Sequence, residues 1–376
     1  MPKLPEGSYS KVIRMVLDNN KEVIARLPTR NVGPAGYITA SEVATMKFAR
    51  ERLGWPVPQV LSWSYTKWHP VKPPFIIMEK APGIEVDKVW HKLSDGHKLN
   101  LIDEIVKLEK AALEALLPAY ASISFHKDVE PDMKAIPVHD KFTIGKSMDR
   151  KDECAFMVIS RGPCRQSVHP TLFHPAMSSG ISAHLATLKL FDSIIPYITP
   201  TDFSELIQPT LWHHDLSGSN IFISRDELAQ DRVVITSVID LQNTYSAPLY
   251  LQAHVPHVVA YHTPWEVPPG LSIVKVPAKA EGMTEVEHED VKQDVFAKNS
   301  EMYYPRKMEK ISPAHYHALT DKKIFNMFGI KLLPSLVLVP YILPRRRNVS
   351  GGKKEKNGRK EMTIYSFYVI ISLGSS

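Results

Sequence analysis

The sequence is poor in cysteine and has no long apolar run. Its 376 residues include only two cysteines, Cys154 and Cys164. Two cysteines do not make a disulfide framework and their spacing matches no zinc pattern, so a reducing compartment is the simplest expectation. The apolar runs at 332–343 and 363–373 are far shorter than the roughly 20 residues that span a bilayer. We therefore expect no transmembrane segment.

The chain also lacks an excess of charge outside one stretch. It has 46 Lys and Arg against 40 Asp and Glu. Eight of the basic residues and one acidic residue fall in 345–360, which leaves 38 basic and 39 acidic residues elsewhere. The body of the chain therefore shows no nucleic-acid-binding footprint. We interpret the basic stretch as a solvated tail rather than a binding patch.

The remaining composition is that of a folded protein with a core. Apolar residues make up 44% and charged residues 23%, which excludes wholesale disorder. No sustained period is visible and 30 prolines are scattered throughout, which excludes collagen-like and coiled-coil classes. The length fits two or three domains, or one two-lobed enzyme.

Apolar runs, periodicity and turn residues predict strands first and helices later. A hairpin is expected from 12–17 and 22–27, and a helix capped by Thr39 or Ser41 should end at Gly54. Further strands are expected at 60–64 and 75–78, helices at 99–117 and 281–300, and a strand–loop–strand–turn–strand unit over 211–240.

The segment LWHHDLSGSNIFIS, residues 211–224, is the most informative one. It places His213, Asp215 and Asn220 in a polar loop between two apolar strands, and the next strand delivers Asp240. Phosphoryl transfer needs a carboxylate near the acceptor hydroxyl and separate oxygen ligands for Mg²⁺. The pattern fits that need. The alternative is that Asp215 and Asn220 are ordinary turn residues.

These residues, with others, carry a family resemblance. The chain resembles the aminoglycoside-phosphotransferase-like branch of the protein-kinase-like superfamily, close to the fungal "altered inheritance of mitochondria" phosphotransferases. The segments that carry it lie in the family's order between about residues 5 and 319: PEGSYSKV, EVIARLP, ASEVATMKFARERLGWPVPQVLSWS, FIIMEKAPGIEVDKVW, FTIGKSMDR, LWHHDLSGSNIFIS, VIDLQNTYSAPLYLQA and SPAHYHAL.

The resemblance implies roles position by position. Asp215 matches the Asp that accepts the acceptor's proton, and His213 the His that supports its loop. Asn220 and Asp240 match the Mg²⁺ ligands. The implied nucleotide-binding residues are Gly7 in the phosphate-covering loop, Arg26 and its partner Glu42, and Glu79 to Ala81 in the hinge that would bind adenine.

The sequence departs from the family's pattern at several places. Arg26 stands where most kinases have Lys, and its planar fork is not equivalent to an ammonium group. The alternative for Arg26 is a surface strand residue. EGSYSKV has one glycine where protein kinases have three, and the start of the small lobe is expected to be truncated. Leu241-Gln242 follows Asp240 where fungal relatives usually have Trp-Gln.

The fold class implied is α+β, a bilobal protein-kinase-like fold with a small antiparallel β lobe with one helix and a larger, mostly helical lobe. We expect the nucleotide-binding lobe at 1–81 and the catalytic lobe at 82–320, with an inserted hairpin region at about 120–165. A divergent, partly disordered tail is expected at 321–376.

The expected activity is transfer of the ATP γ-phosphate, with Mg²⁺, to a hydroxyl of a small molecule or protein that the sequence does not identify. The rival is a pseudokinase-like scaffold associated with mitochondria. No nucleic-acid partner is expected, and the oligomeric state has no sequence signal. MPKLPEGSYSK shows neither a signal peptide nor a presequence, so the expected location is cytoplasmic or, by resemblance, mitochondrial.

Overall fold

The computed structural model describes residues 10–28, 35–66, 69, 73–129, 135–145, 204–242, 244–260, 274–276, 283–320, 339–340 and 368–369. The chain divides into two compact units, Met1–Val168 with Thr201–Leu319, and His169–Pro200 with Thr320–Ser376. In the second unit, β13 (Val339–Pro340) pairs with β14 (Tyr368–Val369). Gly7, the 146–165 part of the expected insertion and the rest of the 321–376 tail lie outside the described residues.

The first unit begins with a four-stranded antiparallel sheet in the order β1-β2-β4-β3. Its strands are β1 (Ser10–Val16), β2 (Glu22–Pro28), β3 (Val60–Ser64) and β4 (Phe75–Glu79). The predicted hairpin is confirmed. In its turn, the N–H of Leu17 donates to the carbonyl of Lys21 and the N–H of Asn20 donates to the carbonyl of Leu17, with Asn20 at a φ of 61°. Asn tolerates this left-handed conformation better than most residues do.

Helix α1 (Ala35–Arg52) starts earlier than the sequence predicts. The prediction that Thr39 or Ser41 caps it is wrong, because both lie inside the helix and are buried. Ser41 instead donates its hydroxyl to the carbonyl of Ile123 at 2.8 Å. A contact 82 residues away, invisible to local sequence patterns, thus occupies the side chain that a cap would use.

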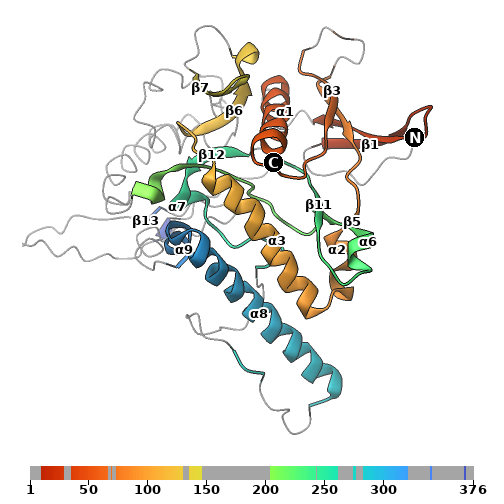
Figure 1. Cartoon of the computed structure of the whole chain (residues 1–376), viewed down its shortest axis with the longest axis vertical. Helices are drawn as coiled ribbons and strands as arrows, with labels where there is room; N and C mark the ends of the chain where they lie inside the picture. The colour runs from red at the N-terminus through yellow and green to blue at the C-terminus, as the bar shows by residue number, and fades with distance from the viewer. Residues whose placement is uncertain are drawn as a thin grey trace, which may run out of the picture. The chain divides into compact units, whose positions relative to one another are not determined.

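A five-stranded sheet lies on the other side of α1, so that the helix lies between β3 and β6 (Figure 1). The strand order is β7-β8-β6-β12-β9. The strands are β6 (Ala121–Phe125), β7 (Ile136–His139), β8 (Phe142–Ile144), β9 (Pro209–Trp212) and β12 (Tyr245–Pro248). Phe48 of α1 meets Phe142 edge to face at 5.4 Å, within one apolar core that joins the helix to both sheets.

The long helices α3 (Asp95–Glu114) and α8 (Glu285–Ile311) pack side by side (Figure 1). The two predicted helices are confirmed, but α3 begins at its capping box of Ser94 and His97, and α8 continues eleven residues past the predicted end. Thr284 and Glu287 form the capping box of α8. Of the helices that the structure describes, none is long and apolar enough to cross a membrane.

Shorter elements complete this unit. The helical ones are α2 (Val86–Val89), α6 (Arg225–Leu228), α7 (Leu249–Gln252), α9 (Pro313–Thr320) and the 3-10 turns η2 (Trp90–Lys92), η3 (His126–Asp128) and η7 (Ser204–Ile207). The remaining strands, β5 (Ile84–Glu85), β10 (Ile221–Ile223) and β11 (Ile235–Val238), form a sheet in the order β11-β10-β5. Together, the antiparallel β lobe with α1 and the helical part beyond β4 make the bilobal kinase-like fold expected from the sequence.

Gly83 links the first sheet to this small sheet, and no other residue fits there. Its φ is +99°, and an added Cβ would lie 2.3 Å from the carbonyl oxygen of Ile223 and 2.5 Å from Oγ1 of Thr236. That hydroxyl also donates to the carbonyl of Pro82 at 2.8 Å. The connection is therefore pressed against β10 and β11, which carry the loop residues described below.

We expect Gly83→Ala to destabilise the protein by roughly 2–4 kcal/mol, because it adds both backbone strain and a clash with backbone. Gly96→Ala is the matched control, because Gly96 lies in the first turn of α3 and its added Cβ would be 3.8 Å from the nearest contact. Urea unfolding measures both variants. Equal stability of the two would contradict the packing described at Gly83.

Candidate functional site

His213 fixes the start of the polar loop after β9. The residue is 2% exposed. Its Nδ1 accepts the backbone N–H of Asp215 at 3.2 Å, so its Nε2 carries the proton and donates to the carbonyl of Ile239 at 2.9 Å. Burial lowers the pKa of His213, which keeps the ring neutral. A neutral His213 therefore ties the loop to the end of β11.

Both carboxylate oxygens of Asp215 have partners. Nδ2 of Asn220 donates to Oδ2 at 3.1 Å and to the Asp215 carbonyl at 3.0 Å. Nδ1 of His257 lies 3.1 Å from Oδ1. The hydrogen bond from His257 is the main cause that lowers the pKa of Asp215, and the same bond raises the pKa of His257. Asp215 is therefore held ionised and half-exposed.

Asp240 lies next to this pair because of the register of two strands. Ile221 pairs with Val238 in the β10–β11 ladder, and the N–H of Ile239 donates to the carbonyl of Asn220 at 3.0 Å. Asp240 follows at once, with a φ of 62°. This left-handed conformation is uncommon outside glycine and turns the chain sharply at the strand end.

Arg26 joins the first sheet to Asp240. It is 9% exposed, so the alternative of a surface strand residue is wrong. Its Nη1 bonds Glu42 of α1, which is 7% exposed, and its Nη2 donates to Oδ1 of Asp240 at 2.6 Å. Burial alone would lower the pKa of Arg26, but Glu42 and Asp240 outweigh burial and raise it. The guanidinium therefore stays charged between two carboxylates.

Together these contacts bring six of the predicted site residues into one hydrogen-bonded network. Glu42, Arg26 and Asp240 form one part, and His213, Asp215 and Asn220 form the other, joined at Ile239. One cation between two carboxylates gives the Arg26 part a net negative charge, and Asn220 adds an amide oxygen to the other part. Such oxygen ligands suit Mg²⁺, which proteins usually bind through one or two carboxylates plus phosphates and water. Within the described ranges, no group of three or more His, Cys, Asp or Glu could hold a metal by itself.

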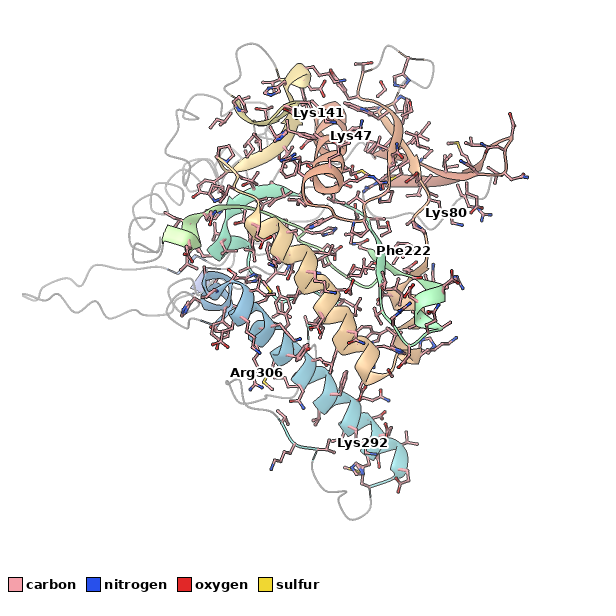
Figure 2. The ribbon with its side chains drawn as sticks, viewed as in Figure 1. Lys47, Lys80, Lys141, Phe222, Lys292 and Arg306 are labelled. Atoms are coloured by element: carbon pink, nitrogen blue, oxygen red, sulfur yellow. The ribbon has the colours of Figure 1, made fainter. Side chains whose placement is uncertain are left out.

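The two predicted hinge residues, Glu79 and Ala81, are not part of this hydrogen-bonded network. Glu79 ends β4, where its N–H donates to the carbonyl of Gln59 at 3.0 Å and its Oε2 accepts the Gln59 N–H at 3.1 Å. Ala81 follows, half-buried, before Gly83. Figure 2 marks this connection by Lys80 at its start and by Phe222 on β10 below it.

Among the described residues, Ser10, Gln242 and His257 contact the site without having been predicted for it. Ser10 accepts the Nε–H of Arg26 at 2.9 Å, and Gln242 accepts from its Nη2 at 2.6 Å. His257 bonds Asp215 as described. The only local signal was the Leu-Gln pair after Asp240, because the other two contacts join distant segments. Metal binding by the histidines at 254, 257 and 262 was not favoured from the sequence, and His262 lies outside the described residues.

The chain is similar in sequence to fungal proteins. No protein-family model matches the chain. A subtelomeric hrmA-associated cluster protein of Aspergillus fumigatus is 30% identical over 80% of this chain and 68% of its own length. The mitochondrial "altered inheritance of mitochondria protein 9" of Saccharomyces cerevisiae is 25% identical over 70% of this chain and 50% of its own. The chain thus spans half of that relative's length.

Among solved structures, the chain is similar to aminoglycoside phosphotransferase APH(4)-Ia, crystallised with AMP-PNP and hygromycin B. The sequence identity is 14%, the TM-score 0.39, and the match covers 84% of this chain and 81% of that one. APH(2")-IIa, crystallised with streptomycin and ATP, gives a TM-score of 0.39 at 15% identity and covers 87% and 83%.

The fold is the bilobal, kinase-like one that the sequence resemblance implied. The chain belongs to the family of the subtelomeric hrmA-associated cluster proteins of Aspergillus fumigatus.

Proposed function

We propose that the protein is a phosphotransferase that binds Mg·ATP and transfers the γ-phosphate to a hydroxyl group. The observation that supports this most is the continuous set of contacts from Asp215 through Asn220 and Ile239 to Asp240 and Arg26. It places an ionised carboxylate, two oxygen ligands and a buried cation within a few hydrogen bonds of one another. These are the groups that positioning and charge stabilisation require for this reaction.

Each residue has one task in the transfer. Asp215 orients the acceptor hydroxyl and takes its proton as the acceptor oxygen bonds to the γ-phosphorus. The bond between that phosphorus and the oxygen of ADP breaks in the same transfer. Arg26, oriented by Glu42, holds the nucleotide phosphates, and His213 keeps the loop in place. Backbone groups of Glu79 to Ala81 bind adenine.

Asn220 and Asp240 are the residues that would hold Mg²⁺. Their amide and carboxylate oxygens fit the ion, and Asp240 is open to solvent on one side, with a side chain 39% exposed. Bound there, Mg²⁺ supplies charge neutralisation of the phosphates. To hold Mg²⁺, Asp240 would have to release Arg26 or share its carboxylate between Arg26 and the ion.

That same contact favours a second candidate, a nucleotide-independent scaffold. Arg26 donates both Nη2 hydrogens, one to Asp240 and one to Gln242, and so occupies the metal ligand itself. In a scaffold this bridge would be permanent and would serve only to join the two lobes. Association with mitochondria would then follow the name of the Saccharomyces cerevisiae relative.

Thermal stabilisation by Mg·ATP separates the two candidates. A phosphotransferase should unfold at a higher temperature with Mg·ATP, and Asp240→Ala should abolish that shift, since a ligand stabilises only the state that binds it. Asp215→Asn should keep the shift but lower ATP turnover about 10²–10⁴-fold, the usual contribution of a general base.

Asp226→Asn is the matched control, because Asp226 is exposed on α6 and outside the site. It should leave both the shift and the turnover unchanged. A wild-type protein with no Mg·ATP shift would overturn the phosphotransferase and favour the scaffold.

A further inference from the structure

The guanidinium of Arg26 donates hydrogen bonds from all three of its nitrogens. Nε donates to Ser10 at 2.9 Å, Nη1 to Glu42, and Nη2 to Asp240 and Gln242 at 2.6 Å each. These four partners come from β1, α1 and the chain after β11. Only one of its five N–H groups, the second on Nη1, has no partner in this set.

A lysine at this position could not replace these contacts. Its ammonium group is one compact point with three donors, whereas the four acceptors here surround a planar group. The ammonium could still pair with Glu42, as a kinase lysine does, but it would leave Ser10 and Gln242 without the donor they now have. The contacts at this position therefore require arginine, which accounts for Arg26 where most kinases have lysine.

Gln242 differs from the other acceptor on Nη2 because it is neutral. If Asp240 held Mg²⁺, its charge would be shared with the ion and its attraction for Arg26 would weaken. Gln242 carries no charge to share and cannot compete strongly for the ion, so its oxygen can keep Nη2 in place. Its own Nε2 is buried and has no hydrogen-bond partner in the part of the chain that the structure describes.

We propose that Gln242 is a positioning residue that fixes the plane of the Arg26 guanidinium for the nucleotide phosphates, and that residues 26 and 242 form a matched pair. This rests on the proposed function, because the pair acts on the nucleotide. Glu42 sets the charge balance of Arg26, and Gln242 would keep the orientation of the guanidinium if Asp240 held the metal.

A double-mutant cycle on Mg·ATP affinity tests the pair. Gln242→Met keeps the side-chain length but removes the acceptor, and should weaken Mg·ATP binding about 5–20-fold while the unfolding midpoint of the nucleotide-free protein changes little. Arg26→Lys should weaken binding about tenfold in the wild type, yet less than threefold in the Gln242→Met background. Gln230→Met, on the exposed turn after α6, is the matched control and should change nothing.

The outcomes separate this inference from the proposed function. If the wild type binds Mg·ATP but Gln242→Met binds equally well, or Arg26→Lys costs the same in both backgrounds, Gln242 has no positioning role. If the wild type binds no nucleotide, the proposed function fails. The coupling between residues 26 and 242 is then measured from the unfolding midpoints of the same variants. Equal midpoint losses for Arg26→Lys in both backgrounds then overturn the pairing as well.

Discussion

Arg26→Met is expected to destabilise the protein by about 3–5 kcal/mol at neutral pH, the usual cost of removing one partner of a buried ion pair. Glu42 is 7% exposed and pairs with no other cation in the described part of the chain, so its charge would be left in the interior. Burial already raises the pKa of Glu42 even with Arg26 present. Without Arg26 the carboxyl must take up a proton or the fold must open.

The double variant Arg26→Met with Glu42→Met should recover most of that loss, because a buried ion pair replaced by apolar groups of similar size is often neutral or stabilising. Lys80→Met is the surface control. Lys80 also pairs with a glutamate, Glu22, but its side chain is 47% exposed, and such pairs contribute about 1 kcal/mol or less. Urea unfolding of the wild type, Arg26→Met, the double variant and Lys80→Met measures these changes in stability. A double variant as unstable as Arg26→Met would show that the charge on Glu42 is not the cause.

Local patterns predicted several elements of the first unit well. Apolar runs and turn residues predicted the β1–β2 hairpin, and helical patterns predicted α3 and α8, because each signal lies within one element or turn. The start of α1 was wrong because Ser41 is used in a contact to β6. Capping preference describes an isolated helix, whereas the side chain of Ser41 makes a tertiary hydrogen bond.

The site shows the same division. The sequence predicted Arg26, Glu42 and Asp240 by resemblance, and the contacts of the structure bring them together. It gave no role to Gln242 or His257, because the partner of each is far away in the chain, 216 residues for Gln242 and 42 for His257. Such contacts depend on how β2 and the segment after α7 dock against the β10–β11 ladder, which no local pattern encodes.

A second buried carboxyl, which has no contact with the site residues named above, lies on α3. Glu109 is 2% exposed, its Oε2 accepts the hydroxyl of Tyr304 at 2.6 Å, and its Oε1 has no partner in the described ranges. Burial raises the pKa of Glu109 to about 8, and the bond from Tyr304 acts in the opposite direction. Next to Tyr304, burial lowers the pKa of His315 to about 3. Both groups are therefore neutral in the folded protein at pH 7.

Glu109→Gln should make the protein more stable than the wild type as the pH rises. The pKa of Glu109 is about 8 in the folded protein against an ordinary value of 4.5, so the folded state keeps a proton that the unfolded chain releases. Its contribution to stability is fully present below about pH 4.5 and is lost as the pH rises to about 8. Glutamine keeps an oxygen for Tyr304 and does not titrate, so this loss disappears.

The expected gain of Glu109→Gln over the wild type grows from near zero at pH 4.5 to about 3–5 kcal/mol at pH 8. His315 acts with the opposite sign, since its lowered pKa costs stability as the pH falls below about 6.5, and it is the same in both proteins. Glu114→Gln is the control, because Glu114 is exposed at the end of the same helix and its curve should run parallel to the wild type. Unfolding by urea at a series of pH values gives all three curves. A Glu109→Gln curve parallel to the wild type between pH 5 and 8 would mean that Glu109 is ionised inside the fold, and that the pair with Tyr304 compensates for its burial.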